Sequence, residues 1–214
     1  MKAIVIEETG GPEKLKLGDL GSPSPGEGQI VVDVAAAGLN FIDTYHRSGL
    51  YPMEFPFTPG VEGAGVVTAV GSGVEDVGVG DRVAWSGQIG SYAEQAVVSA
   101  ASAVPIPDDV DLETAAAVIL QGLTAHYLAT DTFPLTDEHQ CLIHAGAGGV
   151  GLLLTQIAAM KGARVITTVG SEDKAELSRD AGASDVIVYT VTDFKEAVEG
   201  LVGEKSLDVV FDGV

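Results

Sequence analysis

The stretch His144-Ala145-Gly146-Ala147-Gly148-Gly149-Val150-Gly151 decides the fold of this chain. It follows a short apolar run and opens a longer one, so the glycines fall where a strand turns into a helix. In the pattern Gly-x-Gly-x-x-Gly, Gly146 is expected to permit a tight turn, Gly148 to let a pyrophosphate approach the backbone, and Gly151 to let the helix pack on its strand. The N–H groups and positive dipole end of that helix favour phosphates.

Two further strand-and-helix units follow the glycine turn. The capping residues expected for their helices are Ser171 for one and either Thr192 or Asp193 for the other. The predicted strands are residues 164–169, 185–189 and 207–212. Strands that alternate with helices predict a parallel, doubly wound sheet.

The number of strands sets a second expectation. A complete dinucleotide-binding sheet has six strands, whereas residues 140–214 carry four. We therefore expect a fragment of a longer protein, or less simply an unusual half-fold. The fourth strand should lie beside the first, leaving an apolar outer edge prone to aggregation.

Length and composition limit the remaining classes. A chain of 214 residues makes one large or two modest domains. No apolar run is long enough to span a bilayer, and the acidic start does not suit a secretory signal. A single cysteine rules out an internal disulfide and a multi-cysteine zinc site. The simplest expected location is the cytosol.

The chain is strongly acidic, with a formal net charge of −20 from 31 acidic and 11 basic residues. One interpretation is simple solubility. The other is adaptation to high salt, where the repulsion between acidic groups is screened. Under either interpretation nucleic acid is not an expected partner, because its phosphates carry the same charge.

The first half of the chain is of another kind. Residues 1–105 read as short strands separated by glycine and proline, which is typical of a small barrel. A helix from residues 108–111 to about Thr130 is expected to link it to the second half.

Residues 36–51, AAGLNFIDTYHRSGLY, resemble the signature of quinone oxidoreductases, the zeta-crystallin-like, zinc-independent branch of the medium-chain dehydrogenase/reductase superfamily. The resemblance extends over essentially the whole chain. Further motifs occur in order at residues 60–65 (GVEGAG), 70–74 (VGSGV), 80–83 (GDRV) and 121–125 (QGLTA).

This resemblance implies a GroES-like β-barrel domain, residues 1–121, followed by an incomplete Rossmann domain, residues 122–214. Members of the family are longer and dimerise through the far edge of the sheet. The resemblance therefore implies that this chain lacks the edge through which they dimerise and that it has little reductase activity by itself.

The resemblance also bears on metal. Zinc-dependent relatives hold their catalytic zinc through Cys, His and Cys at the positions of Asn40, Val61 and Gln121. Valine cannot bind zinc, and the two amides are poor ligands. His46, His126, His139 and His144 show no ligand-like spacing and are expected to be ordinary surface or core residues. The sequence predicts no metal.

Without a Lewis acid, alcohol oxidation is disfavoured, while hydride transfer to an electrophilic quinone or α,β-unsaturated carbonyl stays accessible. By resemblance, Asn40 bonds the nicotinamide ribose or amide, and Tyr45 or Tyr51 orients the acceptor or delivers a proton. The alternatives are packing tyrosines and, for Arg47, an ion pair. Asp43 and Glu62 are expected to hold loops. The candidate catalytic residues are Asn40, Tyr45, Arg47, Tyr51, Gln121 and Thr124.

The end of the second Rossmann strand bears on the cofactor. NAD enzymes usually carry an acid there, but this strand ends Thr168-Val169-Gly170-Ser171. Residues matching Gly170, Ser171, Lys174 and Tyr189 surround the 2′-phosphate in similar reductases, so NADPH is predicted. Glu172 and Asp173 oppose this, and Lys174 has the alternative of pairing with an acid of its own helix. The expected cofactor residues are Asn40, Thr124, Gly146, Ala147, Gly148, Gly149, Val150, Gly151, Gly170, Ser171, Lys174 and Tyr189.

The leading hypothesis is an NADPH-dependent reductase of a small quinone or enone, with neither a nucleic acid nor a membrane as partner. An enoyl-thioester reductase on the same scaffold is the closest alternative among enzymes. A nucleotide-binding protein without turnover is the alternative from another class.

Overall fold

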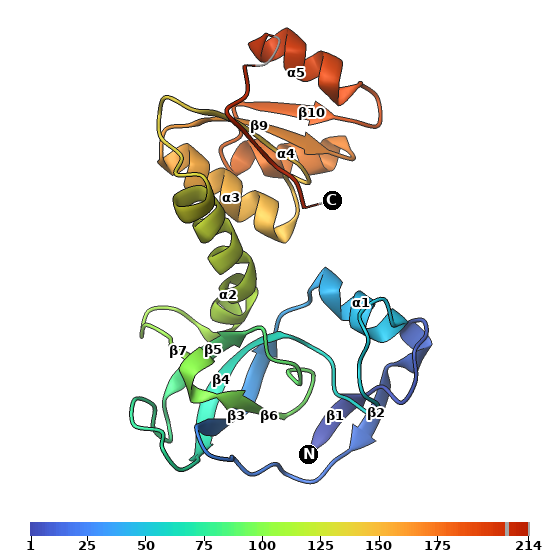
Figure 1. Cartoon of the computed structure of the whole chain (residues 1–214), viewed down its shortest axis with the longest axis vertical. Coiled ribbons are helices and arrows are strands. Elements are labelled where there is room, and N and C mark those ends of the chain that lie inside the picture. The colour runs from blue at the N-terminus through green and yellow to red at the C-terminus, as the bar shows by residue number, and fades with distance from the viewer. Residues whose placement is uncertain (204–205, 214) are drawn as a thin grey trace. The chain divides into compact units, whose positions relative to one another are not determined.

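The computed structural model describes residues 1–203 and 206–213. The chain forms two compact units, Met1–Leu120 and Gln121–Val214, and each is described by itself (Figure 1). The sequence prediction put the domain boundary between residues 121 and 122.

The first unit is an antiparallel β structure, as expected from its short strands. A two-stranded sheet pairs β1 (Lys2–Val5) with β2 (Lys16–Asp19). A five-stranded sheet has the order β6-β3-β4-β5-β7, made by β3 (Gln29–Ala37), β4 (Glu62–Val70), β5 (Arg82–Ser86), β6 (Gln95–Ser99) and β7 (Val104–Pro105). Its alternating residues bury a core of Ile30, Val32, Val67, Val83, Trp85 and Val98.

Helix α1 (Phe41–Ser48) lies between β3 and β4 and was not anticipated among the strands. Its ends carry ordinary helix signals. Asn40 and Asp43 form a capping box at the start, and Gly49 takes the left-handed conformation, with φ of 83°, at the end. The helix places the residues of the family signature on one short, rigid element.

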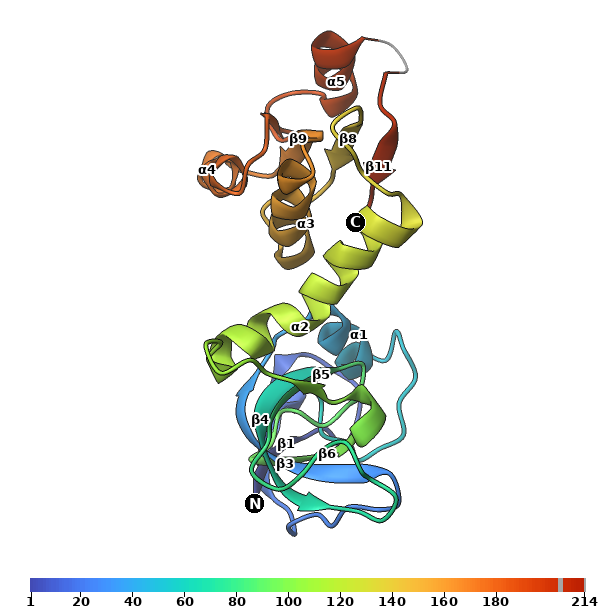
Figure 2. The same ribbon diagram turned by 90° about the vertical axis from the view of Figure 1, so that its left-hand side faces the viewer.

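The second unit is a parallel sheet with the order β10-β9-β8-β11. Figure 2 labels β9, β8 and β11 of this sheet. Its strands are β8 (Gln140–Ile143), β9 (Arg164–Val169), β10 (Asp185–Val188) and β11 (Val209–Phe211). The prediction that the fourth strand pairs with the first is confirmed, because β11 is hydrogen-bonded to β8. β11 is the outermost strand of the described sheet, and Val210 on it is 49% exposed.

Helices cover both faces of this sheet. Cys141 and Ile143 pack with Leu154 of α3 (Gly149–Met160), whereas Leu142 points to the other face and packs with Val198 of α5 (Phe194–Val202). The helix between β9 and β10 is α4 (Glu172–Asp180). Successive residues of β8 are buried on opposite faces, each under a helix, so the sheet is doubly wound, as predicted.

The predicted linking helix is α2 (Leu112–Tyr127), which begins in the first unit and ends in the second. A single π turn, Leu128–Thr132, follows it. Among the described residues no helix is both long and apolar enough to cross a membrane.

Both predicted helix starts are found. Of the two residues considered for α5, Asp193 rather than Thr192 is the N-cap, and its carboxylate accepts from the N–H groups of Lys195 and Glu196 at 2.9 and 3.1 Å. Ser171 is the N-cap residue of α4, as predicted, but its side chain makes no capping hydrogen bond.

Candidate functional site

In the glycine turn of the second unit, the reasons why individual residues are needed differ from the predicted ones. Ala145, and not Gly146, takes the left-handed conformation, with φ of 51°. Gly146 is instead required by packing, because a Cβ there would lie 2.5 Å from Cβ of Thr167 and 2.9 Å from Oγ of Ser178. Glycine at position 146 therefore lets the backbone of the turn pack directly on β9 and α4.

The next two glycines of the motif, Gly148 and Gly151, lie at the start of helix α3. A Cβ on Gly151 would lie 2.2 Å from the carbonyl oxygen of Ala145, so only glycine lets the helix approach the turn this closely. Gly148 caps the helix without a side chain, and a Cβ there would meet the same oxygen at 3.2 Å. The N–H groups in the first turn of a helix have no partners within the helix. At the start of α3 no side chain of Gly148 shields them, so a phosphate can reach them.

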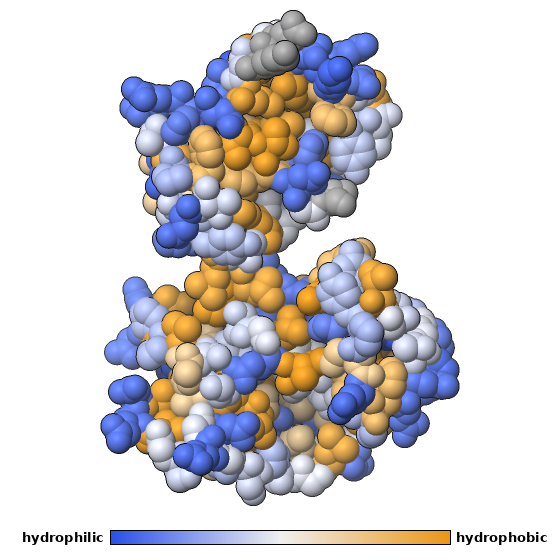
Figure 3. All heavy atoms as spheres, viewed as in Figure 1, coloured by the Kyte–Doolittle hydropathy of each residue, from blue (hydrophilic) through white to orange (hydrophobic). Residues whose placement is uncertain are grey.

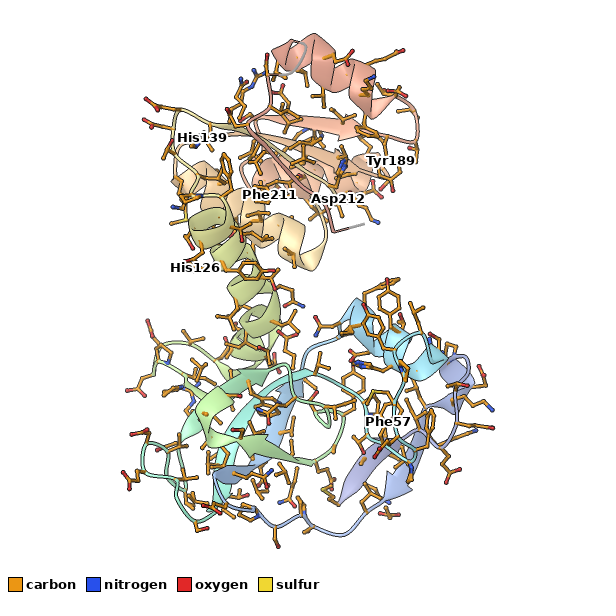
Figure 4. The ribbon with its side chains drawn as sticks, in the orientation of Figure 1. Phe57, His126, His139, Tyr189, Phe211 and Asp212 are labelled. Atoms are coloured by element: carbon orange, nitrogen blue, oxygen red, sulfur yellow. The ribbon has the colours of Figure 1, made fainter. Side chains whose placement is uncertain are left out.

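A cleft of about 720 Å³ opens at the carboxyl ends of the parallel strands, where doubly wound sheets bind ligands. Figure 4 labels two of its residues, Tyr189 after β10 and Asp212 after β11. The lining residues are His144, Ala145, Ala147, Gly148, Thr168, Val169, Gly170, Lys174, Tyr189, Thr192, Asp193, Phe194 and Asp212. Of the predicted cofactor residues, Ala147, Gly148, Gly170, Lys174 and Tyr189 line this cleft.

The cleft contains one cation, Lys174, in the first turn of α4. The alternative that Lys174 pairs with an acid of its own helix is not what the structure shows. Glu172 pairs instead with Arg179 at 2.8 Å, and within residues 1–203 and 206–213 no ion pair joins Lys174 to an acid. The ammonium group of Lys174 is thus available to a ligand, and the charge of Glu172 is partly neutralised.

Tyr189 lies against the end of β9. A Cβ on Gly170 would sit 2.9 Å from the Tyr189 hydroxyl oxygen, so the absence of a side chain at this position lets the phenol approach the backbone. Ser171 is exposed and does not line the cleft.

Other cleft residues were not predicted. Nδ1 of His144 lies 2.8 Å from Oγ1 of Thr168, and the His144 ring packs edge-on against Phe194 with centroids 5.2 Å apart. Both partners of His144 also line the cleft. The signal that could have located them is position, since His144 and Thr168 fall at the carboxyl ends of neighbouring strands.

Asn40 belongs to a buried polar cluster in the first unit. Its Nδ2 donates to Oε2 of Glu62 at 2.8 Å, and the N–H of Leu120 donates to Oε1 of the same carboxylate at 2.7 Å. Asp43 accepts from the N–H of Asn40 at 3.0 Å and from the Tyr92 hydroxyl at 2.7 Å. Asp43 and Glu62 therefore hold loops and helix ends, as predicted.

Burial also affects Tyr92 in this cluster. Desolvation, followed by the hydrogen bond and the negative charge of Asp43, raises the pKa of Tyr92. Its hydroxyl therefore stays protonated and acts as a permanent donor to Asp43.

The aromatic residues of the signature gather on α1 and just after it. The ring of Tyr45 meets those of Phe41 and Tyr51 edge-on, each at 5.3 Å between centroids. Tyr51 is 47% exposed. Among the described residues Arg47 has no ion pair of the kind considered for it, and its Nη1 donates to the carbonyl oxygen of Gly10 at 2.7 Å.

The last two candidate catalytic residues, Gln121 and Thr124, lie on α2 in the second unit and are half-buried. The Gln121 side chain packs at the start of α3, with its Cγ 3.0 Å from where a Cβ of Gly149 would be. Among the described residues, no three His, Cys, Asp or Glu side chains are grouped so that they could hold a metal ion.

A second, smaller hollow of about 270 Å³ lies between α5 and β11. Its apolar lining includes Leu142, Val198, Leu207 and Val210. Figure 3 shows apolar side chains gathered on this unit below α5.

Comparison with known proteins matches each unit to a domain family. The alcohol dehydrogenase GroES-like domain family matches residues 26–108, and the zinc-binding dehydrogenase family matches residues 149–214. The chain is 44% identical over 213 residues to a quinone oxidoreductase of Salmonella typhimurium, covering 99% of this chain and 65% of that protein. It thus spans just under two thirds of the length of this relative.

Solved structures agree with this. A mycobacterial protein in complex with NADPH is 47% identical, with a TM-score of 0.95, over 100% of this chain and 67% of its own. The Escherichia coli quinone oxidoreductase in complex with NADPH is 41% identical, with a TM-score of 0.96, over 99% and 66%. The chain therefore belongs to the quinone oxidoreductase family, with a GroES-like domain followed by the doubly wound domain of the zinc-binding dehydrogenases.

Proposed function

We propose that this chain belongs to an NADPH-dependent reductase of quinones or α,β-unsaturated carbonyls that works without zinc. The observation that carries the proposal is made at the end of β9. Gly170 and Ser171, and not an acid, directly follow the strand, and Lys174 lines the cleft without an ion-pair partner among the described residues. Two relatives with known structures were solved with NADPH.

The cleft suits this cofactor in shape and in charge. Gly148 leaves the start of α3 open to a pyrophosphate, and Lys174 offers a cation for the additional phosphate of NADPH. Tyr189 supplies a flat ring and a hydroxyl beside Gly170. Asp193 and Asp212 can accept hydrogen bonds from hydroxyl groups elsewhere in the cleft.

The nicotinamide supplies the hydride when the cofactor is bound. The protein binds, orients and donates protons. Asn40 is the proposed contact to the nicotinamide end. Tyr45 or Tyr51 is the proposed donor that orients the acceptor carbonyl and protonates the oxygen that gains negative charge. Gln121 and Thr124 are proposed to contact the reacting groups from α2. The family dimer and a cytosolic location stay predictions.

The direct test measures oxidation of NADPH by the protein to which this chain belongs, with a simple quinone and with a simple enone, and repeats both with NADH. We expect turnover with NADPH, faster than with NADH. Binding of NADPH without turnover of either acceptor would favour a nucleotide-binding protein. Faster turnover of an enoyl thioester than of either acceptor would favour the alternative reductase.

We predict that activity needs no metal. Asn40, Val61 and Gln121 stand at the three positions where zinc-dependent relatives carry ligands, and none of these side chains is a good ligand for zinc. Elemental analysis after washing with a chelator should find no stoichiometric zinc, and turnover should be unchanged. Zinc that stays bound and is needed for turnover would contradict this.

We predict that the protein becomes more stable as salt increases. With a net charge of −20, repulsion among exposed carboxylates opposes folding, and added ions screen it. From low to molar KCl the melting temperature should rise by about 5 °C, or roughly 1–2 kcal/mol for a chain of this size. A flat or falling curve would leave solubility as the role of the acidic surface.

A further inference from the structure

The buried carboxylate of Glu62 is the least expected group in the first unit. Its residue is 0% exposed, and it stands at the start of β4. Burying a carboxylate is costly unless N–H or O–H groups satisfy its oxygens. Here Oε2 accepts from Nδ2 of Asn40 and Oε1 accepts from the N–H of Leu120.

The two donors differ in what they can do. The N–H of Leu120 belongs to the backbone of α2 and can only donate a hydrogen bond. The amide of Asn40 can turn over and present either oxygen or nitrogen to Glu62. An ionised carboxylate only accepts, so it selects the orientation in which Nδ2 of Asn40 faces Glu62.

The start of α1 is compatible with this orientation. The N–H of Asp43 donates to the backbone carbonyl oxygen of Asn40 at 3.0 Å, and the Asn40 side chain makes no capping hydrogen bond of its own. The hydrogen bond to Glu62 is therefore a contact that selects the polarity of the Asn40 amide.

The neighbouring chain is shaped around this carboxylate. A Cβ on Gly38 would lie 1.9 Å from Oε2 of Glu62, and the N–H of Gly38 donates to the carbonyl oxygen of Glu62 at 3.1 Å. Only glycine at this position leaves room for the carboxylate beside Asn40.

We propose that Glu62 is a positioning residue that fixes the polarity of the Asn40 amide and thereby the hydrogen-bonding groups which Asn40 offers to the nicotinamide end of the cofactor. The role toward the cofactor rests on the proposed function, whereas the coupling of Glu62 to Asn40 does not. Glu62 acts through Asn40 and does not touch the reacting atoms.

The first test is Glu62→Gln, which keeps the shape but has only one accepting oxygen. The backbone N–H of Leu120 can only donate, so the oxygen of the new glutamine has to face Leu120. The NH₂ group of the glutamine then faces Asn40, and the Asn40 amide has to turn over to present its oxygen. We expect the melting temperature to fall by about 5 °C and kcat/KM with NADPH to fall by about tenfold.

The second test exchanges the two groups. In the double variant Glu62→Gln with Asn40→Asp, the amide at position 62 donates to the carboxylate at position 40. We expect this variant to regain at least half of the lost melting temperature, whereas its kcat/KM should stay low because an aspartate at position 40 has no N–H to offer to the cofactor. Asn40→Asp alone should have a lower melting temperature than Glu62→Gln or the double variant, because it brings two carboxylates to hydrogen-bond distance.

A matched control is Asp33→Asn. Asp33 also accepts from an amide, Nε2 of Gln95 at 2.8 Å, but this pair is exposed on the sheet. This acid-to-amide change should leave the melting temperature and kcat/KM unchanged.

The outcomes separate the two proposals. Additive effects on melting temperature, or a double variant no better than the single ones, would overturn the role of Glu62 even if the wild type is active. Absence of turnover in the wild type would overturn the proposed function, and the melting cycle alone would then decide whether Glu62 fixes Asn40.

Discussion

Replacing Lys174 with alanine is expected to weaken NADPH binding by about ten- to hundredfold, which corresponds to roughly 1.5–3 kcal/mol for a hydrogen bond to a charged group. NADH binding should hardly change. Lys174 lines the cleft and has no ion-pair partner among the described residues, and Gly170 and Ser171 stand at the end of β9 in place of an acid. The charge therefore serves the phosphate that NADPH has and NADH lacks.

Calorimetric titration of both cofactors measures this difference. Lys195→Ala is the matched control, because Lys195 is an exposed lysine of α5 that does not line the larger cleft. It should leave both affinities unchanged. Equal losses for NADPH and NADH in Lys174→Ala would contradict the assignment of Lys174 to the additional phosphate.

Replacing Gly151 with alanine is expected to destabilise the second unit by about 2–3 kcal/mol, through forced displacement of packed backbone. The added Cβ would lie 2.2 Å from the carbonyl oxygen of Ala145, and neither group can move without shifting α3 or the turn. Chemical denaturation followed by circular dichroism measures the loss. Cofactor binding should fall with it, because the same turn shapes the cleft.

Two other glycines separate packing from binding. In Gly148→Ala the Cβ would be 3.2 Å from the same oxygen, so stability should change little while the side chain obstructs the approach of a pyrophosphate. In Gly200→Ala, inside α5, no atom lies within 4 Å of the new Cβ, so the variant should gain about 0.5–1 kcal/mol. Stability equal to wild type in Gly151→Ala would refute the packing role of Gly151.

Much of the second unit follows from its sequence, because burial and local geometry point the same way there. Strands of β-branched residues alternate with helices, and the order of the four strands follows from the parallel topology. The detail of the turn does not follow. The left-handed residue is Ala145, since contacts with Thr167 and Ser178 demand a glycine at 146 for packing instead.

The first unit shows what sequence patterns miss. Helix α1 is short and sits among strands, so its signal lies in the caps Asn40 and Gly49 rather than in apolar periodicity. The partners of Asn40 are far away in the chain, at Glu62 and Leu120, and only the folded structure brings them together. Long-range polar contacts of this kind leave no local pattern.

For the residues around His144, the sequence carried a signal of position but none of contact. Histidine in an apolar segment is usually an ordinary core or surface residue, and its bond to Thr168 joins the ends of two parallel strands. The doubly wound topology predicts where these ends meet, but not which side chains meet there.

The most direct test of the central claim is an NMR titration of the chain with adenosine 2′,5′-bisphosphate, using adenosine 5′-phosphate for comparison. The account predicts that the bisphosphate binds more tightly and shifts the backbone amide signals of residues 145–151, 168–174 and 189, which line or surround the cleft. Equal affinity for the two nucleotides, or shifts confined to the first unit, would contradict an NADPH site built around Lys174.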